Sequence, residues 1–175
     1  MNTKFKKYNR DKIEDLTSYL KDYINKIDGE VEIMIGSDSQ ANEFWNNATF
    51  VEVICIYTRG KGAHVIFKQE KRVRVHGKNK QEKMMDRLWQ EIYRAVDVAT
   101  FLRDQDILDI SKVKAIDVQL HLDINKHSEH ESNKVHDNAV GYVNALGFDC
   151  HTKPDAPAAS FAADHICRGY HLKYH

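Results

Sequence analysis

Two aspartates lie at the C-terminal ends of segments of the sequence that predict β-strands. Asp38 is the last residue but one of residues 31–39 (VEIMIGSDS), and Asp123 is the last residue but one of residues 114–124 (KAIDVQLHLDI). If these strands are parallel neighbours, both carboxylates emerge at the same edge of the sheet, where open α/β sheets bind ligands. Carboxylates held that close repel each other unless a cation neutralises them or one takes up a proton. Hard divalent cations such as Mg²⁺ and Mn²⁺ prefer oxygen ligands, so the pair is a candidate metal site.

Two further acids lie in predicted helices. Glu91 borders the apolar stripe of the helix predicted for residues 79–103, which also carries Glu82 and Asp86. The structural alternative for Glu91 is an ordinary ion pair with an arginine one turn away on either side. Asp164 lies in PAASFAADHIC, a run too small and apolar to need a charge for solubility. Its alternative is a solvent-facing position on a short terminal helix.

Four other residues are candidates for supporting the acids or contacting a substrate. His121 lies two residues before Asp123, so it points to the same face of the strand. Trp45, in the loop after the first strand, is the best aromatic candidate for stacking on a base. We expect a Trp45→Ala change to weaken substrate binding more than stability. Ser39 and Lys153 are further candidates for these roles.

The elements that must position these residues alternate in a way that predicts a mixed α/β sheet. Three strands joined by short connections predict an antiparallel meander, and the later strands are reached by helical crossovers. Hydrophobic periodicity predicts nine elements, in this order: helix 10–28, strands 31–39, 49–58 and 63–75, helix 79–103, strand 114–124, helix 132–145, strand 148–152 and helix 157–167. We expect one domain, with residues 1–29 forming an N-terminal helix packed on a core domain of residues 30–175.

Charge is balanced over the whole chain but not along it. The 26 Lys and Arg residues equal the 26 Asp and Glu residues, which argues against a general polyanion-binding protein. Residues 59–83 nevertheless carry nine Lys or Arg against Glu70 and Glu82, a net charge of about +7 by that count. Such a segment suits a phosphate backbone, and equally a solvated edge hairpin whose cations discourage aggregation. Neither a membrane-spanning run nor an export signal is found, and the three cysteines lack CxxC spacing, so we expect a cytoplasmic protein with reduced thiols.

The quoted motifs carry a resemblance to a known family. GSDSQ (36–40), RLWQEI (87–92), HLDIN (121–125), GYVNALGFD (141–149) and KPDAPAASFAADHICRG (153–169) resemble the YkuK-type ribonuclease H-like proteins, over roughly residues 30 to 170. The resemblance implies a ribonuclease H-like mixed five-stranded sheet with a β-β-β-α-β-α-β-α core, here with an additional N-terminal helix. It also implies that Asp38, Glu91, Asp123 and Asp164 are the metal-binding catalytic acids.

The chemistry implied by the resemblance is two-metal hydrolysis of a phosphodiester in RNA or DNA. Two Mg²⁺ or Mn²⁺ ions would bridge the scissile phosphate, one activating water and the other stabilising the leaving oxygen. A non-catalytic nucleic-acid-binding or assembly module that keeps the fold remains the alternative. A phosphotransferase of the sugar-kinase branch is disfavoured, because the eight glycines form no phosphate-binding loop.

Overall fold

A six-stranded mixed sheet forms the centre of the molecule, with strand order β1-β4-β3-β2-β5-β6. The computed structural model describes the chain except for residues 1–4, 43, 45, 128, 130–131 and 170–175. The strands are β1 (Lys6–Lys7), β2 (Val31–Ala41), β3 (Asn47–Thr58), β4 (Gly62–Arg74), β5 (Val113–Asn125) and β6 (Asp149–Lys153). The helices are α1 (Leu16–Lys26), α2 (Lys80–Asp104), α3 (Asn133–Ala145), η1 (Ala158–Ala163, a π-helix) and α4 (Asp164–Cys167).

The pairing of the strands confirms the predicted fold class. β2, β3 and β4 form an antiparallel meander. The long helix α2 then crosses over to β5, which pairs parallel to β2, and α3 crosses over to β6, which pairs parallel to β5. The carboxyl ends of β2 and β5 therefore lie side by side at one edge of the sheet.

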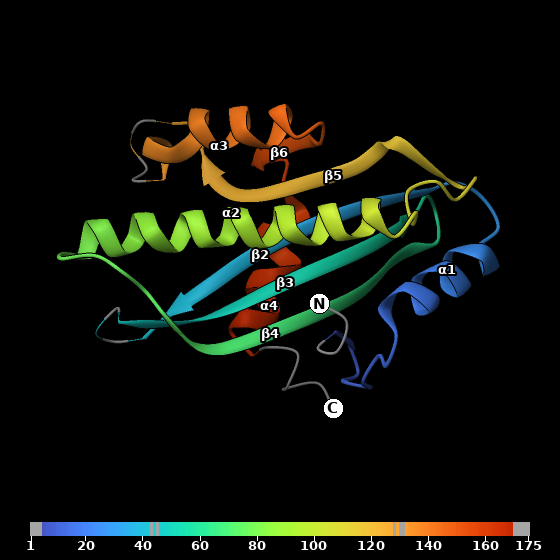
Figure 1. Cartoon of the computed structure of the whole chain (residues 1–175), viewed down its shortest axis with the longest axis horizontal. Helices are drawn as coiled ribbons and strands as arrows, with labels where there is room; N and C mark the ends of the chain where they lie inside the picture. The colour runs from blue at the N-terminus through green and yellow to red at the C-terminus, as the bar shows by residue number, and fades with distance from the viewer. Residues whose placement is uncertain (1–4, 43, 45, 128, 130–131, 170–175) are drawn as a thin grey trace.

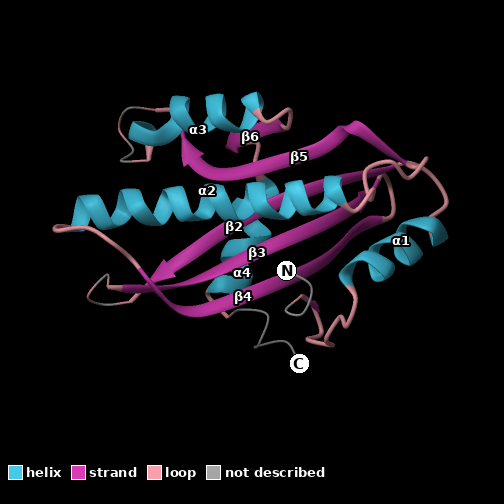
Figure 2. Ribbon diagram, viewed as in Figure 1, coloured by secondary structure: helices cyan, strands magenta, loops and turns pink. Residues whose placement is uncertain are grey.

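Helices cover both faces of the sheet (Figures 1 and 2). α2 lies across one face and the η1–α4 segment lies across the opposite face. Apolar residues of α1, α2 and α3 share one core cluster with the inward side chains of β2, such as Ile33 and Ile35. A smaller cluster joins Ala158 and Ile166 to Val53 of β3 on the η1–α4 face. This two-sided burial fixes the alternation along β2, so that Asp38 faces η1–α4 while Ser39 faces α2.

Three local features differ from the sequence-based expectation. The first helix begins at Leu16 rather than near residue 10, because Asp15 caps it by accepting a hydrogen bond from the Ser18 N–H at 3.0 Å. The strand β1 adds a two-residue edge beyond the five expected strands. The last helix is a π-helix over its first six residues, a widening that hydrophobic periodicity does not encode.

None of the helices within the described residues combines the length and apolar character needed to cross a bilayer.

Candidate metal-binding site

The parallel pairing of β2 with β5 brings the two strand-end aspartates together. Ser37 pairs with Leu122 in the register of the two strands, and Asp38 and Asp123 follow these residues directly. Both aspartates line one cavity of about 440 Å³, which we call the acidic hollow. Its lining residues are Asp38, Ser39, Gln40, Ala41, Asn42, Arg87, Asp123, Asp164 and Arg168. Three of the four acids singled out from the sequence therefore share one hollow.

Asp38 is the buried acid of the hollow, with 9% of its surface exposed. Burial, together with the neighbouring carboxylates of Asp123 and Asp164, raises the pKa of Asp38 to about 7, against the lowering effects of the Ser39 backbone N–H and of Arg87. The ionised form is therefore disfavoured unless additional positive charge enters the hollow.

Glu91 is buried beneath the hollow on α2. Burial and the nearby charge of Asp38 raise the pKa of Glu91 well above its usual value, while Arg87 and a hydrogen bond from Ser39 oppose that rise. Ser39 Oγ is the donor of this short hydrogen bond to Glu91 Oε1. Glu91 therefore approaches Asp38 from the α2 face of the sheet, at the end of β2. The four acids thus lie around the carboxyl ends of β2 and β5.

The two acids that precede Glu91 on α2 have different surroundings. Glu82 accepts the backbone N–H of Lys78 at 2.7 Å, and Asp86 accepts the backbone N–H of His76 at 2.9 Å. Both side chains thus fasten the loop that precedes α2. Of the five acids on this helix, only Glu91 is buried, and it lies next to Asp38.

Asp123 and Asp164 each have a cationic partner. Lys153 Nζ lies 2.8 Å from Asp123 Oδ1, and Ser160 Oγ donates to the same oxygen at 2.9 Å. Arg168 Nε donates to Asp164 Oδ1 at 2.5 Å. The side chains of Lys153 and Arg168 are 40% and 52% exposed, so both have solvent beside them into which they can swing.

The donor set is suited to a hard cation. Carboxylate oxygens surround the region, and neither a thiol nor an imidazole lines the acidic hollow. As the side chains stand, with Asp123 and Asp164 turned to Lys153 and Arg168, no three His, Cys, Asp or Glu groups within the described part of the chain form a ready ligand cluster. A cation bound here would replace these ion pairs at both aspartates.

His121 acts as a structural link to the last helical segment. Its side chain is buried, and its Nδ1 accepts a hydrogen bond from the Ala158 N–H at 3.1 Å, at the start of η1. The Nε2 atom therefore carries the proton and lies 3.0 Å from Gln119 Oε1. Burial and His151 lower the pKa of His121 to about 4, so the ring is neutral. It ties β5 to the segment that carries Asp164.

Several residues of the site were not singled out from the sequence. Arg168 follows Asp164 by four positions, a helical ion-pair spacing that would have indicated it. Ser160 carries no such signal, because its contact with Asp123 joins segments distant in the sequence. Trp45, by contrast, was named from the sequence and lies outside the described residues.

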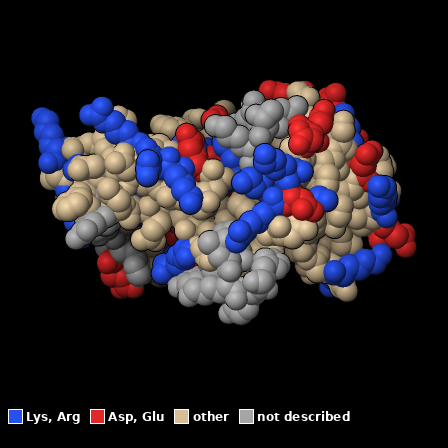
Figure 3. Space-filling view, turned by 90° about the horizontal axis from the view of Figure 1, so that it is seen from below, with Lys and Arg blue, Asp and Glu red and all other residues tan. Residues whose placement is uncertain are grey.

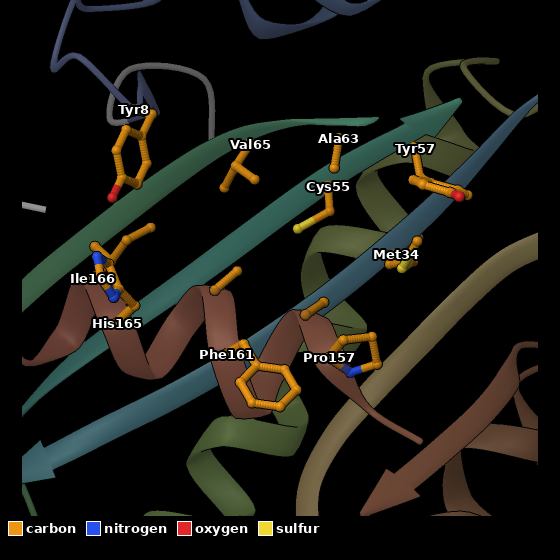
Figure 4. Close-up of a pocket in the computed structure, with 12 residues that line it drawn as sticks. Tyr8, Met34, Cys55, Tyr57, Ala63, Val65, Pro157, Phe161, His165 and Ile166 are labelled. Atoms are coloured by element: carbon orange, nitrogen blue, oxygen red, sulfur yellow. The ribbon is translucent and has the colours of Figure 1, made fainter. Parts of the chain in front are cut away.

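A larger hollow of about 670 Å³ lies elsewhere, between η1–α4 and the strands β2, β3 and β4 (Figure 4). Its lining includes Met34, Cys55, Val65 and Phe161 and contains no carboxylate. It offers mainly apolar contacts, and no carboxylate for a hard cation.

The fold and the converging acids define an α/β protein of ribonuclease H-like architecture. A family model described as "Ribonuclease H-like" matches residues 14–168, so the chain belongs to the ribonuclease H-like family. The match confirms the resemblance read from the motifs and extends it to include α1. Neither the search of curated proteins nor the search of solved structures found a match.

Proposed function

We propose that the protein is a divalent-metal-dependent nuclease that hydrolyses phosphodiester bonds in RNA or DNA. The observation that carries this proposal is the position of Asp38, buried in one hollow with Asp123 and Asp164. Burial and the neighbouring acids raise the pKa of Asp38 to about 7, because they destabilise its ionised form. A bound cation would offset this destabilisation. The ribonuclease H-like family membership of the chain supports the same reading.

Mg²⁺ or Mn²⁺, as two ions, fit the oxygen donors of this region. Asp38, Glu91, Asp123 and Asp164 would hold them, since three of these carboxylates line the hollow and the fourth is buried beside Asp38. Bound divalent ions would polarise the phosphodiester and lower the pKa of an attacking water.

The chain's own side chains would do the remaining work. Arg87 lines the hollow and donates to the carbonyl of Ser39, so it keeps the end of β2 in place. Lys153, once released from Asp123, carries an ammonium group that can contact a phosphate oxygen of the substrate. Carboxylate oxygens that are not bound to a cation can accept a hydrogen bond from water and orient it.

A cleavage assay on a panel of labelled single-stranded RNA, single-stranded DNA, their duplexes and the hybrid tests this proposal. We expect cleavage in Mg²⁺ or Mn²⁺, none in EDTA, and a loss of at least about a hundredfold in Asp38→Asn. Asp109→Asn, an exposed acid in the loop before β5, is the matched control and should cleave as the wild type does. Cleavage that survives in Asp38→Asn would overturn the assignment of the site.

One observation favours a second candidate function. Lys153 and Arg168 already neutralise Asp123 and Asp164, which a protein without bound metal would need. On this alternative the chain is a non-catalytic nucleic-acid-binding or assembly module. The same panel separates the two functions, because the module would bind labelled strands without cleaving any of them in either metal.

A further inference from the structure

Two parts of the basic segment of residues 59–83 differ in their surroundings. The first is Lys68, which a buried carboxylate neutralises, and the second is the C-terminal end, residues 74–83, which borders a cavity. In the first part, Lys68 Nζ lies 3.1 Å from Glu52 Oε1. Arg94 of α2 donates to the same oxygen at 2.7 Å and to Glu70 Oε2 at 3.0 Å. Glu52 is 1% exposed, so this is an internal ion network between α2 and the sheet. Its cations are already paired and are poor candidates for holding a ligand.

The second part surrounds a separate cavity of about 240 Å³, which we call the basic hollow. Its lining residues are Asn46, Arg74, Val75, His76, Gly77 and Lys83. Lys83 Nζ donates at 2.7 Å to the amide oxygen of Asn46, a neutral acceptor. Within the described residues no ion pair joins the Arg74 guanidinium to a carboxylate. Two acids lie near the loop, Asp86 at 3.5 Å from His76 Nδ1 and Glu82 bonded to the Lys78 N–H, but neither lines the hollow. The charged side chains that line the hollow are therefore both cations.

This positive charge comes from side chains and not from the start of α2. The Asn79 side chain caps the helix by accepting the Glu82 N–H at 2.9 Å, and Glu82 in turn accepts the Lys78 N–H. The backbone N–H groups of Glu82 and Lys83 in the first turn are thus already bonded to Asn79. Seen from below, Lys and Arg side chains gather at the upper left, near the start of α2, whereas both signs of charge mix at the right (Figure 3).

The basic hollow lies next to the acidic hollow. Lys83 lines the first and Arg87 the second, and the two residues are one helical turn apart on α2, a rise of about 6 Å. The loop after β2 joins them as well. Asn42 lines the acidic hollow, and its Oδ1 accepts the backbone N–H of Asn46, which lines the basic hollow, at 3.0 Å. A strand that enters one hollow can therefore continue directly into the other.

We infer that the basic hollow binds a backbone phosphate of a nucleic-acid strand whose neighbouring phosphate lies in the acidic hollow. Arg74 presents a planar fork of donors and Lys83 a point charge, and together they suit the oxygens of one phosphate. Lys83 and Arg87 lie about 6 Å apart along α2, which is close enough for one strand to contact both hollows. This inference rests on the proposed function for its choice of ligand, and it assigns the basic segment a role at its C-terminal end only.

Binding of a short fluorescein-labelled oligouridylate and of the matching oligothymidylate, followed by fluorescence anisotropy in EDTA over a range of salt concentrations, tests the inference. For Arg74→Gln/Lys83→Gln we expect weaker binding of both strands, and a slope of log K against log salt that is smaller by about 0.7–1, the loss of one phosphate contact. Arg59→Gln/Lys71→Gln is the matched control, because it removes two exposed cations of the same segment outside the hollow. Its slope should equal that of the wild type.

An unchanged slope in the Arg74/Lys83 variant, with its thermal midpoint preserved, would overturn the inference. So would an equal reduction in the Arg59/Lys71 control, since the attraction would then be a diffuse property of the whole segment. The outcome is independent of catalysis, because EDTA removes the metal. A wild type that shows the hollow-dependent slope but cleaves nothing in Mg²⁺ or Mn²⁺ would leave the phosphate site in place and refute the nuclease proposal alone.

Discussion

Arg87 donates a hydrogen bond from Nη1 to the backbone carbonyl of Ser39 at 2.5 Å, and so fastens the first half of α2 to the end of β2. The same nitrogen lies 3.2 Å from Ser39 Oγ and 4.0 Å from Glu91 Oε1. One guanidinium therefore holds the strand that carries Asp38 and offsets the charge of the buried glutamate. The acidic hollow depends on this contact before any cation arrives.

Replacing Arg87 by methionine should destabilise the protein by about 1–3 kcal/mol, because it removes the side-chain donor to the Ser39 carbonyl and the cation beside the buried Glu91. Urea unfolding monitored by circular dichroism measures the loss. Adding Glu91→Gln to the same variant should recover part of it, since the unpaired charge is then gone. Strictly additive losses in this double-mutant cycle would show that the two side chains do not interact.

Asp38 should make the metal-free protein less stable as the pH rises. Its pKa is about 7 in the folded state, against 3.8 for the unperturbed group, so the folded protein holds a proton that the unfolded chain releases within this window. The free energy of unfolding therefore falls as the pH rises towards 7, by about 1.4 kcal/mol for each unit by which the pKa is raised. Above pH 7 this contribution is constant. His121, with its lowered pKa of about 4, acts in the opposite direction below pH 6.5.

The comparison of wild type with Asp38→Asn in EDTA reports the contribution of Asp38 together with its effect on the pKa of Glu91, because His121 is common to both. The variant should be of similar stability at pH 4.5 and progressively more stable than the wild type up to about pH 7. Thermal midpoints across this range provide the measurement. A constant difference between the two proteins would contradict the raised pKa.

Divalent ions should stabilise the wild type and not Asp38→Asn. A ligand that binds only the folded state adds about 2.7 kcal/mol at a hundred times its dissociation constant. Thermal scans with Mn²⁺ titrated at pH 8 should show a rising midpoint in the wild type and in the exposed-acid control Asp109→Asn. If the Asp38→Asn midpoint rises equally, the ions bind somewhere other than the acidic hollow.

Glu52 should be among the most costly polar residues to remove. It is buried and receives both Lys68 and Arg94 on one oxygen, so Glu52→Ala strands two partly buried cations and should cost about 2–4 kcal/mol. Glu14→Ala, at an exposed position before α1, is the control and should lie within about 0.5 kcal/mol of the wild type. Chemical denaturation compares them, and equal midpoints for the two variants would show that the network contributes no net stability.

Gly77 allows the loop before α2 to approach the helix closely. Its φ is +144°, and an added Cβ would lie 2.6 Å from the Lys83 backbone nitrogen. Gly77→Ala should therefore cost about 1–3 kcal/mol and widen the basic hollow. Gly141→Ala on α3 meets no atom within 4 Å and should instead stabilise by about 0.4–1 kcal/mol. Unfolding midpoints that shift in the same direction for both variants would contradict the steric argument.

The sequence predicts the sheet and the two long crossovers because these elements have strong periodicities. Val31, Ile33 and Ile35 alternate as a strand must, and Leu88, Ile92 and Val96 recur at helical spacing. The parallel pairing of β2 with β5 then follows from the order of the elements, and with it the nearness of Asp38 to Asp123.

The sequence could not predict the contacts between segments that are far apart in the chain. Local periodicity gives Glu82, Asp86 and Glu91 one helix but cannot say which of them faces the end of β2. The hydrogen bonds of Ser39 to Glu91 and of Ser160 to Asp123 join residues 52 and 37 positions apart. The π-helical turn of η1 likewise depends on packing against β2 and β3, because its alanine-rich sequence carries no signal for a wider helix.

The placement of Asp164 on the last helix has a consequence for synthesis of the protein. The ribosome releases the chain from its N-terminus, so β2, α2 and β5 emerge and can pair while the terminal helical segment is still in the exit tunnel. Until that segment leaves the tunnel, Ser160 cannot reach Asp123 and His121 has no Ala158 N–H to accept. A nascent chain whose η1 and α4 have not yet emerged can therefore form the sheet but lacks Asp164, the fourth acid of the candidate site.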